Sequence, residues 1–193
     1  GRIGTKKQED ELNPPETQKV SIEQITNVKG LKYKVTKVYE DGTGEVTLLK
    51  AVDKDFDKRH PVLKISDSIC IDGKMFKVSA VGNQAFSHSE QFKTVVIGNN
   101  VIEIGSKAFY KCVRLKKVIT PATVNKIGRK AFCGCKRLRN INIKTKRLTG
   151  KKIGEKAFKA INTRAKIKVP KRKLKAYRRI LRRKGVGLKV KIS

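Results

Sequence analysis

The chain has 193 residues, which fits one domain of ordinary size or one domain with a tail. No run of about 18 apolar residues exists, so a transmembrane helix is excluded. The sequence given does not begin with basic residues followed by an apolar stretch, so it shows no signal-peptide pattern. Lys and Arg number 48 against 16 Asp and Glu, but 32 of these basic residues and a single acid, Glu155, fall in residues 105–193. This uneven charge predicts a binding module whose favoured partners are polyanions.

The first third of the chain shows two kinds of pattern. Residues 1–30 are polar, contain Pro14-Pro15 and have no long period, and we interpret them as an extended linker or spacer. Residues 31–80 alternate apolar and polar positions around a turn at residues 41–44, which predicts a β-hairpin followed by further strands. We expect this segment to form an N-terminal β cap. Residues 53–57 carry three alternating Asp but lack the Gly and Glu of a calcium loop, so a solvated turn is expected.

An internal repeat decides the expected fold of residues 81–170. The dipeptide Ala-Phe recurs with its Phe at positions 86, 109, 132 and 158, and a Gly stands four residues before each Phe. Apolar residues nine and eleven positions after most of these Phe are one strand period apart, so they share one face of a short strand. Because a unit of about 23 residues cannot bury its apolar residues alone, the units must stack and cover one another. We expect a buried column of Phe side chains, with Phe109 and Phe132 in it, and tight turns at the Gly.

The four cysteines do not form a metal-binding pattern. Cys133 and Cys135 are separated by one residue, and the two histidines, His60 and His88, neighbour no Cys. We therefore expect neither a metal nor another cofactor. Cys112 and Cys135 occupy the same small-residue position in successive units, which predicts buried, reduced thiols, whereas Cys133 should be more accessible.

The stretch from Ile104 to Val124, IGSKAFYKCVRLKKVITPATV, resembles the repeat of the BspA-type leucine-rich repeat family, I-G-x-x-A-F-x-x-C-x-x-L-x-x-V-x-I-P-x-x-V. The likeness has few departures over residues 81–143 and is looser to residue 170. It implies a right-handed parallel solenoid, usually on secreted or surface-attached bacterial proteins. It also implies interaction with proteins or host surfaces and no shared catalytic residues.

Residues 171–193 follow a pattern typical of a helix and a strand. Pro170 suits the start of a helix, and Gly185 suits its end. One face of this helix is apolar, with Leu174, Tyr177, Ile180 and Leu181. A final strand is expected over residues 188–192. Such a basic amphipathic helix could lie on an anionic membrane, but the last repeat needs a cover, so a C-terminal cap is the favoured interpretation.

Equivalent positions in stacked units lie side by side, so the basic residues of the repeats are expected to form columns. Two like charges about 5 Å apart repel by about 0.8 kcal/mol in water, and one acid cannot relieve several columns. Solubility alone would not predict the near-total exclusion of acids from this half of the chain. With two helix arginines, the candidate polyanion-binding residues are Lys93, Lys107, Arg114, Lys116, Lys130, Arg137, Arg139, Arg178 and Arg182.

The expected fold is thus mainly β, a leucine-rich-repeat parallel solenoid of about four units with an N-terminal β cap and a C-terminal helix-strand cap. The expected function is non-catalytic binding in a secreted or cell-surface protein, with anionic cell-wall polymers or host glycans and proteins as partners. Nucleic acid is the alternative partner, although no known nucleic-acid-binding motif occurs. An enzyme is disfavoured because His60 and His88 stand beside no recognisable nucleophile motif.

Overall fold

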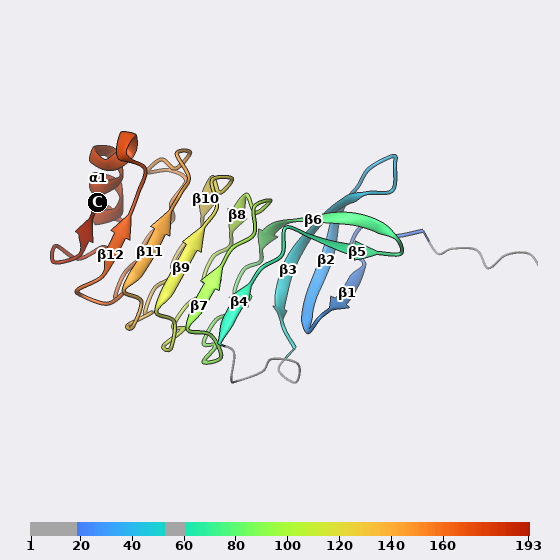
Figure 1. Cartoon of the computed structure of the whole chain (residues 1–193), viewed down its shortest axis with the longest axis horizontal. Coiled ribbons are helices and arrows are strands. Elements are labelled where there is room, and N and C mark those ends of the chain that lie inside the picture. The colour runs from blue at the N-terminus through green and yellow to red at the C-terminus, as the bar shows by residue number, and fades with distance from the viewer. Residues whose placement is uncertain (1–18, 53–60) are drawn as a thin grey trace, which may run out of the picture.

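The computed structural model describes residues 19–52 and 61–193, which form two sheets, a series of turns and one C-terminal helix (Figure 1). Residues 1–18 of the expected spacer, the expected solvated turn at residues 53–57 and His60 lie outside the described residues. In Figure 1 the strands stand side by side along the long axis of the molecule, with α1 at one end and β1 and β2 near the other.

The N-terminal strands form an antiparallel meander that leads into parallel pairing. Strands β1 (Ile25–Val28), β2 (Leu31–Val38) and β3 (Gly44–Ala51) pair antiparallel in sequence order, which confirms the predicted hairpin. β1 lies inside the segment assigned to the spacer, so the spacer boundary at residue 30 is wrong. Four residues of β1 carry too short an alternation to be recognised without the neighbouring strand that pairs with them.

The first sheet continues from this meander along the units. β3 pairs in parallel with β6 (Lys74–Val81), β6 with β8 (Glu103–Ile104), and β8 with β10 (Lys126–Ile127), while β5 (Ser68–Ile71) pairs antiparallel with the same β6. A single bridge between Ile127 and Ile153 extends this face by one more unit.

The second sheet is parallel throughout. Its order is β13-β12-β11-β9-β7-β4, and its strands are β4 (Val62–Lys64), β7 (Thr94–Val96), β9 (Lys117–Thr120), β11 (Asn140–Ile143), β12 (Lys166–Lys168) and β13 (Lys191–Ile192). Leu63 of β4 is in register with Val95 of β7, so part of the segment expected to be a separate cap already belongs to the parallel stack.

A third face consists of turns that bond one unit to the next, and we define these turns (residues 82–89, 105–112, 128–135 and 154–161) as the turn ladder. In the second unit, the backbone N–H groups of Lys107, Phe109 and Lys111 donate to carbonyls of the third unit over 2.8–2.9 Å. Lys107 and Lys111 are left-handed, with φ of 54° and 51°. The Phe-minus-two and Phe-plus-two residues of the other units are left-handed as well. These turns therefore align alternate N–H groups along the stack, as a strand would.

The repeated glycines serve a different purpose from the tight turn that we expected. Gly105, Gly128 and Gly154 do not have a left-handed φ, but each lies against the backbone of the preceding unit. A Cβ at Gly128 would lie 2.4 Å from the Ser106 nitrogen, and one at Gly154 would lie 2.2 Å from the Arg129 nitrogen. The glycine is needed because two backbones approach closely there, and the left-handed turn positions fall on its neighbours instead.

The predicted Phe column is confirmed. Successive rings from Phe86 to Phe158 stack with centroids 5.3–5.4 Å apart and interplanar angles of 3–15°. Phe109 and Phe132 are 0% and 1% exposed. The strand residues Val118 and Ile141, nine positions after a Phe, are also buried. One continuous core thus runs through all four units.

The C-terminal end of the core is covered by the helix. After the 3₁₀ turn η2 (Lys171–Lys173), helix α1 (Leu174–Arg183) buries Tyr177 and Leu181. β13 then pairs with β12, although it is shorter than the expected strand over residues 188–192. Because Tyr177 and Leu181 pack on the chain itself, these two side chains are not available to enter a membrane.

We expect Gly128→Ala to destabilise the protein by about 3 kcal/mol, because the added methyl group must push apart two hydrogen-bonded backbones. Gly150→Ala is the matched control, since nothing lies within 4 Å of a Cβ at that position. The free energy of unfolding in urea measures both changes. Equal stabilities of the two variants would show that the units do not pack as closely as described.

Candidate functional site

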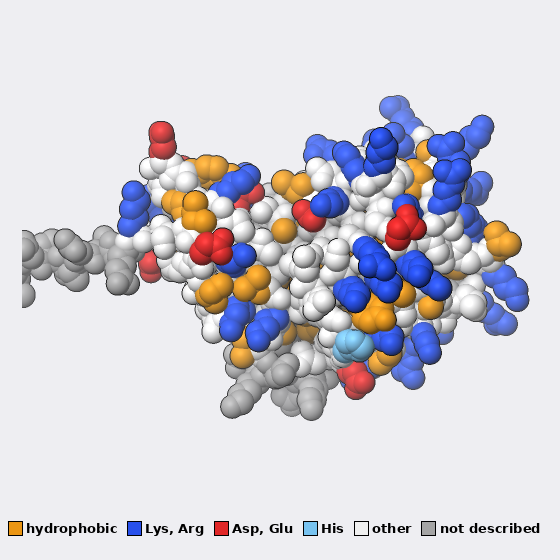
Figure 2. Space-filling view, turned by 180° about the vertical axis from the view of Figure 1, so that it is seen from behind, with side chains coloured by type: hydrophobic (Ala, Val, Ile, Leu, Met, Phe, Trp, Pro, Cys, Tyr) orange, Lys and Arg blue, Asp and Glu red, His pale blue; other side chains and the backbone are white. Residues whose placement is uncertain are grey.

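The basic side chains gather on the C-terminal half of the molecule. Figure 2 shows Lys and Arg crowded over the repeats and the helix, whereas the N-terminal half carries both signs of charge. Within the described part of residues 105–193, the one acid, Glu155, forms an ion pair with Lys184 at 3.0 Å between Nζ and Oε1. The candidate site is therefore a surface with an unbalanced positive charge.

Three predicted site residues form one column beside the second sheet. The backbone nitrogen of Lys116 bonds to the Lys93 carbonyl at 2.8 Å, and that of Arg139 bonds to the Lys116 carbonyl at 3.1 Å. These residues are therefore direct neighbours in consecutive units. Lys116 and Arg139 are exposed and Lys93 is half-buried.

Arg114 and Arg137 stand two residues before Lys116 and Arg139 and extend this column. Arg137 is exposed, whereas Arg114 donates from Nη1 to the Glu90 carbonyl at 3.2 Å. The structure thus brings five of the nine predicted residues together, and we refer to Lys93, Arg114, Lys116, Arg137 and Arg139 as the loop cations.

Two other predicted residues, Lys107 and Lys130, lie on the turn ladder. Both are half-buried and left-handed, with φ of 54° and 53°. The ammonium nitrogen of Lys107 lies 5.4 Å from the centre of the Tyr110 ring, a distance that permits a cation–π contact. These lysines form their own column, seven residues before Arg114 and Arg137 in each unit.

Arg178 and Arg182, the remaining predicted residues, bond to the chain itself. The Arg178 guanidinium donates twice to the Ile192 carbonyl, at 3.1 and 3.2 Å. Arg182 donates to the Val190 carbonyl at 2.8 Å and also to the Gly187 carbonyl. Both arginines therefore hold the last strand against α1.

Sequence reasoning missed a row of polar residues on the outer face of the second sheet. Lys117, Asn140, Lys166 and Lys191 are register partners on β9, β11, β12 and β13. Lys117, Asn140 and Lys166 border a cavity of about 450 Å³ that Lys168 and Asn142 also line. The signal was present for three of them, because Lys117, Asn140 and Lys166 stand eight positions after a repeat Phe, directly before a buried strand residue.

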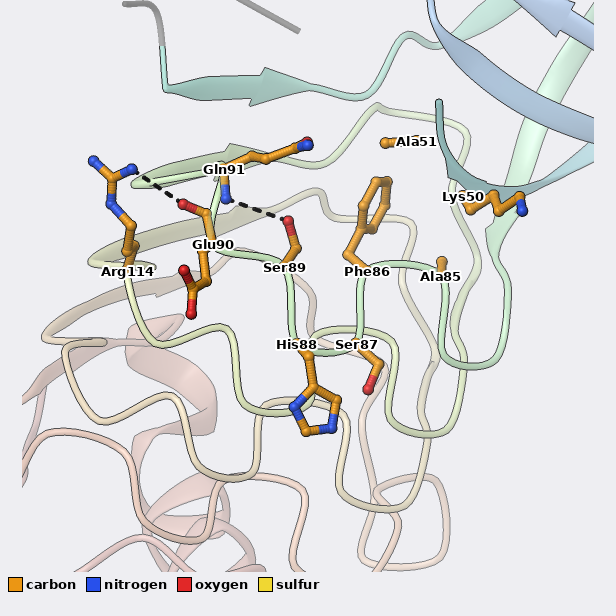
Figure 3. Close-up of a pocket in the computed structure, with 10 residues that line it drawn as sticks. All are labelled: Lys50, Ala51, Ala85, Phe86, Ser87, His88, Ser89, Glu90, Gln91 and Arg114. Carbon is orange, nitrogen blue, oxygen red and sulfur yellow. Dashed lines mark hydrogen bonds between the residues drawn. The ribbon is translucent and has the colours of Figure 1, made fainter. Parts of the chain in front are cut away.

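A second cavity, of about 660 Å³, opens at the first unit (Figure 3). Lys50, Glu90 and Arg114 bring charges to it, and Ser89 is directed toward Gln91, whose backbone nitrogen lies 3.4 Å from the Ser89 oxygen. The His88 ring points away from these residues. It lies nearly perpendicular to the Tyr110 ring, with the two ring centroids 5.4 Å apart. Within the described residues, His88 makes no hydrogen bond to a serine.

The comparisons with known proteins agree with this geometry. The family model described as the BspA type leucine rich repeat region (6 copies) matches residues 72–180. The chain belongs to the BspA-type leucine-rich repeat family.

Solved structures of other bacterial leucine-rich repeat proteins have the same fold. One from Bacteroides capillosus is 21% identical with a TM-score of 0.63, covering 76% of this chain and 98% of its own. A leucine rich cell surface protein from Faecalibacterium prausnitzii is 23% identical with a TM-score of 0.58, covering 77% of this chain and 37% of its own. A leucine-rich repeat protein from Bacteroides ovatus is 28% identical with a TM-score of 0.58, and the match covers 75% of this chain and 36% of that protein. No curated protein matches the sequence.

Two further observations concern membranes and metals. No helix among residues 19–52 and 61–193 is both long and apolar enough to cross a membrane. The same part of the chain contains no group of three or more His, Cys, Asp or Glu placed to hold a metal ion.

The family's Cys position is occupied by two buried thiols, as predicted. Cys112 and Cys135 are 2% and 0% exposed and form no disulfide. Their Sγ atoms donate to the carbonyls of Phe86 and Phe109, one unit back, at 3.1 and 3.0 Å. A hydrogen bond with Cys112, together with burial, raises the pKa of the Cys135 thiol, so its reactive thiolate form is suppressed. Cys133 is half-buried, as expected of the more accessible thiol.

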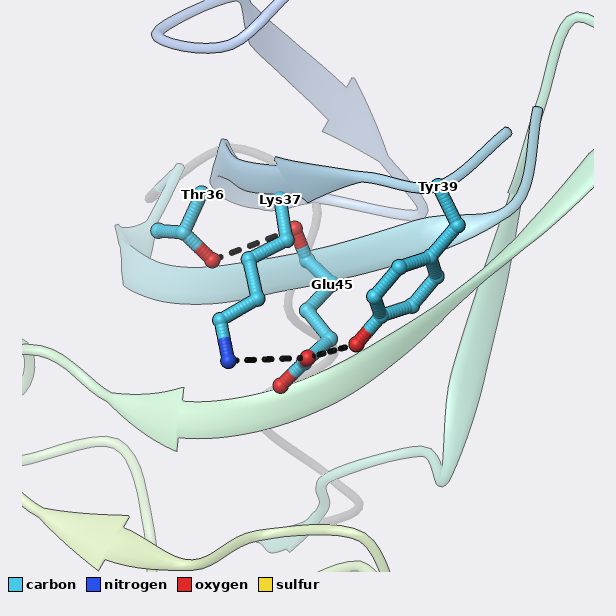
Figure 4. Close-up of polar contacts among 4 residues, drawn as sticks. All are labelled: Thr36, Lys37, Tyr39 and Glu45. Atoms are coloured by element: carbon cyan, nitrogen blue, oxygen red, sulfur yellow. Dashed lines mark hydrogen bonds and ion pairs between the residues drawn. The ribbon is translucent and has the colours of Figure 1, made fainter. Parts of the chain in front are cut away.

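The one buried acid of the described residues, Glu45, lies on β3 of the first sheet (Figure 4). The carboxylate of Glu45 accepts a hydrogen bond from the Tyr39 hydroxyl and pairs with Lys37 at 3.3 Å. Burial alone would raise the pKa of Glu45, but hydrogen bonds from Tyr39, Ser79 and Lys37 outweigh it and hold this pKa below its ordinary value.

A thiol-specific reagent should react quickly with Cys70 and Cys133 in the native protein and slowly with Cys112 and Cys135. The first two are exposed or half-buried, and the last two react only when a unit opens. The variants Cys70→Ser and Cys133→Ser assign the fast reactions. Labelling of Cys112 at the rate seen in denaturant would refute this arrangement.

Tyr39→Phe should make stability less dependent on acid. Because the pKa of Glu45 is lower in the folded than in the unfolded state, its stabilisation is present above the unfolded pKa and is lost as the pH falls through the folded one. Removal of the hydroxyl raises the folded pKa, so the variant should lose less stability than the parent between about pH 7 and pH 3. Urea unfolding at both pH values measures this, with Tyr110→Phe as control; an equal loss in Tyr39→Phe and the parent would contradict it.

Proposed function

We propose that this chain is the solenoid of a non-catalytic binding module, with a β cap and a helix-strand cap, on a secreted or cell-surface protein. Its ligands are anionic cell-wall polymers or anionic host and surface partners, bound through the loop cations and the lysines of the turn ladder. The observation that carries the proposal is the alignment of cations in consecutive units in a half of the chain with one acid, already paired.

The stacking makes this charge costly to keep. Adjacent parallel strands are about 4.8 Å apart, so each loop cation has a like charge at the equivalent position of a neighbouring unit. A linear polyanion lying along the stack would meet cations at this spacing and would relieve the repulsion. Its binding would also release counterions from both partners, which favours association.

The turn ladder adds a second cost. Lys107, Lys130 and Lys156 occupy left-handed positions, where a residue with a Cβ is less stable than Gly by about 1 kcal/mol. Solubility would be served as well by lysines at unstrained exposed positions. Charge held at strained positions and in columns supports a role in binding.

Membership of the BspA-type family supports the proposed location, because the family's repeats usually occur on secreted or surface-attached bacterial proteins. The Faecalibacterium prausnitzii relative is described as a cell surface protein, which agrees with it.

The proposal predicts that polyanion affinity falls steeply with salt and depends on the loop cations. Reversing Lys116, Arg137 and Arg139 to Glu should weaken binding of heparin, teichoic acid and DNA alike by at least about tenfold and reduce the log–log salt slope by about 3. Fluorescence anisotropy at two or more salt concentrations measures both quantities.

The matched control reverses Lys29, Lys64 and Lys77, three exposed lysines of the N-terminal half. It changes the net charge of the protein by the same amount and should leave the affinity within about twofold. Loss for DNA of one sequence only would support the nucleic-acid alternative. If heparin, wall polymer and DNA all fail to bind at low salt, the proposal is wrong and the cations serve solubility.

A further inference from the structure

A groove runs between α1 and the loop of residues 148–151, apart from the loop cations and the turn ladder. It encloses about 700 Å³. On the helix side its residues recur at spacings of three and four, so they occupy one face of α1 along about 15 Å. The lining residues are Leu148, Thr149, Gly150, Lys151, Lys173, Ala176, Arg179, Ile180, Arg183 and Lys184.

The two walls of the groove are fixed to each other by a buried tyrosine. The Tyr177 hydroxyl accepts a hydrogen bond from the Leu148 nitrogen at 3.2 Å and donates to the Thr145 carbonyl at 2.8 Å. The Thr145 hydroxyl in turn donates to the Val124 carbonyl at 2.5 Å. The groove is therefore preformed, and a ligand need not pay for ordering its walls.

The rim of the groove is cationic. One of its cations, Lys184, is paired with Glu155. Within the described residues, the other four rim cations, Lys151, Lys173, Arg179 and Arg183, have no ion-pair partner. The neighbouring helix arginines, Arg178 and Arg182, are bound to the last strand and leave this face to its own cations.

The floor of the groove is apolar, which separates it from the other basic surfaces. Leu148 is buried at its base, and Ala176 and Ile180 are partly buried hydrophobic residues packed on the core. A polymer of sulfates or phosphates alone would leave this floor unused. A peptide that alternates acidic and apolar side chains would use both, and about five extended residues span 15 Å at about 3.3 Å per residue.

We propose that this groove binds an acidic peptide segment of a partner protein, with one or two apolar side chains on the floor and carboxylates against Lys151, Lys173, Arg179 and Arg183. The segment lies along α1 in an extended conformation. This site is independent of the polyanion surface proposed above, because it shares no residue with it.

The proposal is tested by measuring how tightly the whole chain binds three probes, using fluorescence anisotropy at about 0.15 M salt. The first is a blocked, labelled hexapeptide of sequence Glu-Leu-Asp-Leu-Glu-Asp, whose two Leu lie on one side of an extended chain; the second has both Leu replaced by Ser, and the third is a short heparin fragment. The Leu peptide should bind at least tenfold more tightly than the Ser peptide. Equal affinities would overturn the proposal, because they would leave charge as the only determinant.

A charge-reversal pair locates the site. Arg179→Glu with Arg183→Glu should weaken binding of the Leu peptide by at least tenfold. Arg172→Glu in η2 with Lys175→Glu in α1 makes the same change of charge outside the groove and should weaken binding less than threefold. Equal weakening by the two pairs would overturn the proposal. Ala176→Gln partly fills the floor without changing the charge, so it should weaken binding of the Leu peptide but not of heparin. This variant replaces the first pair if that pair lowers the melting temperature of the protein.

The two proposals can fail separately. Heparin binding that depends on Lys116, Arg137 and Arg139 tests the repeat surface, and peptide binding that depends on Arg179 and Arg183 tests the groove. If heparin binds more tightly than the Leu peptide and its binding is lost with Arg179→Glu and Arg183→Glu, the groove binds a polysaccharide. That result would overturn the peptide assignment.

Discussion

The close approach of one backbone to the next at the turn ladder is the constraint on which the rest of the structure depends. Only a glycine fits where Gly128 meets Ser106 and where Gly154 meets Arg129. This contact sets the distance between units, and the N–H groups around each Phe then reach carbonyls of the next unit. With that distance fixed, the Phe rings stack at nearly constant spacing and both sheets keep their register.

The same distance creates the electrostatic character of the surface. A repeat that places a Phe above a Phe also places a Lys above a Lys, so the rule that builds the core multiplies any charge on the outside. The chain resolves part of this inside itself, since Arg114, Arg178 and Arg182 bond to backbone carbonyls and Lys184 bonds to Glu155. Lys116, Arg137 and Arg139 remain exposed, which is the physical basis for the anionic partner that we propose.

The sequence was most informative where a residue recurs in every unit. Equal spacing of Phe109 and Phe132 predicted their stacking, because stacked units put equivalent positions next to each other. The reason for each Gly was not predictable, since spacing shows that a small residue is needed but not whether conformation or close contact demands it. The place of β4 in the parallel sheet was missed because its partner, Val95, lies 32 residues away and β4 carries no Ala-Phe.

The candidate site was predictable only in part. The loop cations follow from the repeat. Arg178 and Arg179 have different roles because consecutive residues of α1 point in different directions around the helix axis. No sequence pattern states which side of a helix will face the carbonyls of a later strand. The groove beside α1 was missed for the same reason, because its loop and its helix are joined by the Tyr177 hydroxyl rather than by sequence.

The hydrogen bonds of the turn ladder also have a mechanical consequence. They run along the stack, from one unit to the next, so tension applied between the two ends of the stack pulls directly along them. Bonds loaded in this direction break a few at a time, as in a zipper, and each unit can detach while its neighbours stay folded. A tethered protein built in this way would lengthen stepwise under flow and shorten again when the pull ends, with each step equal to the chain released by one unit.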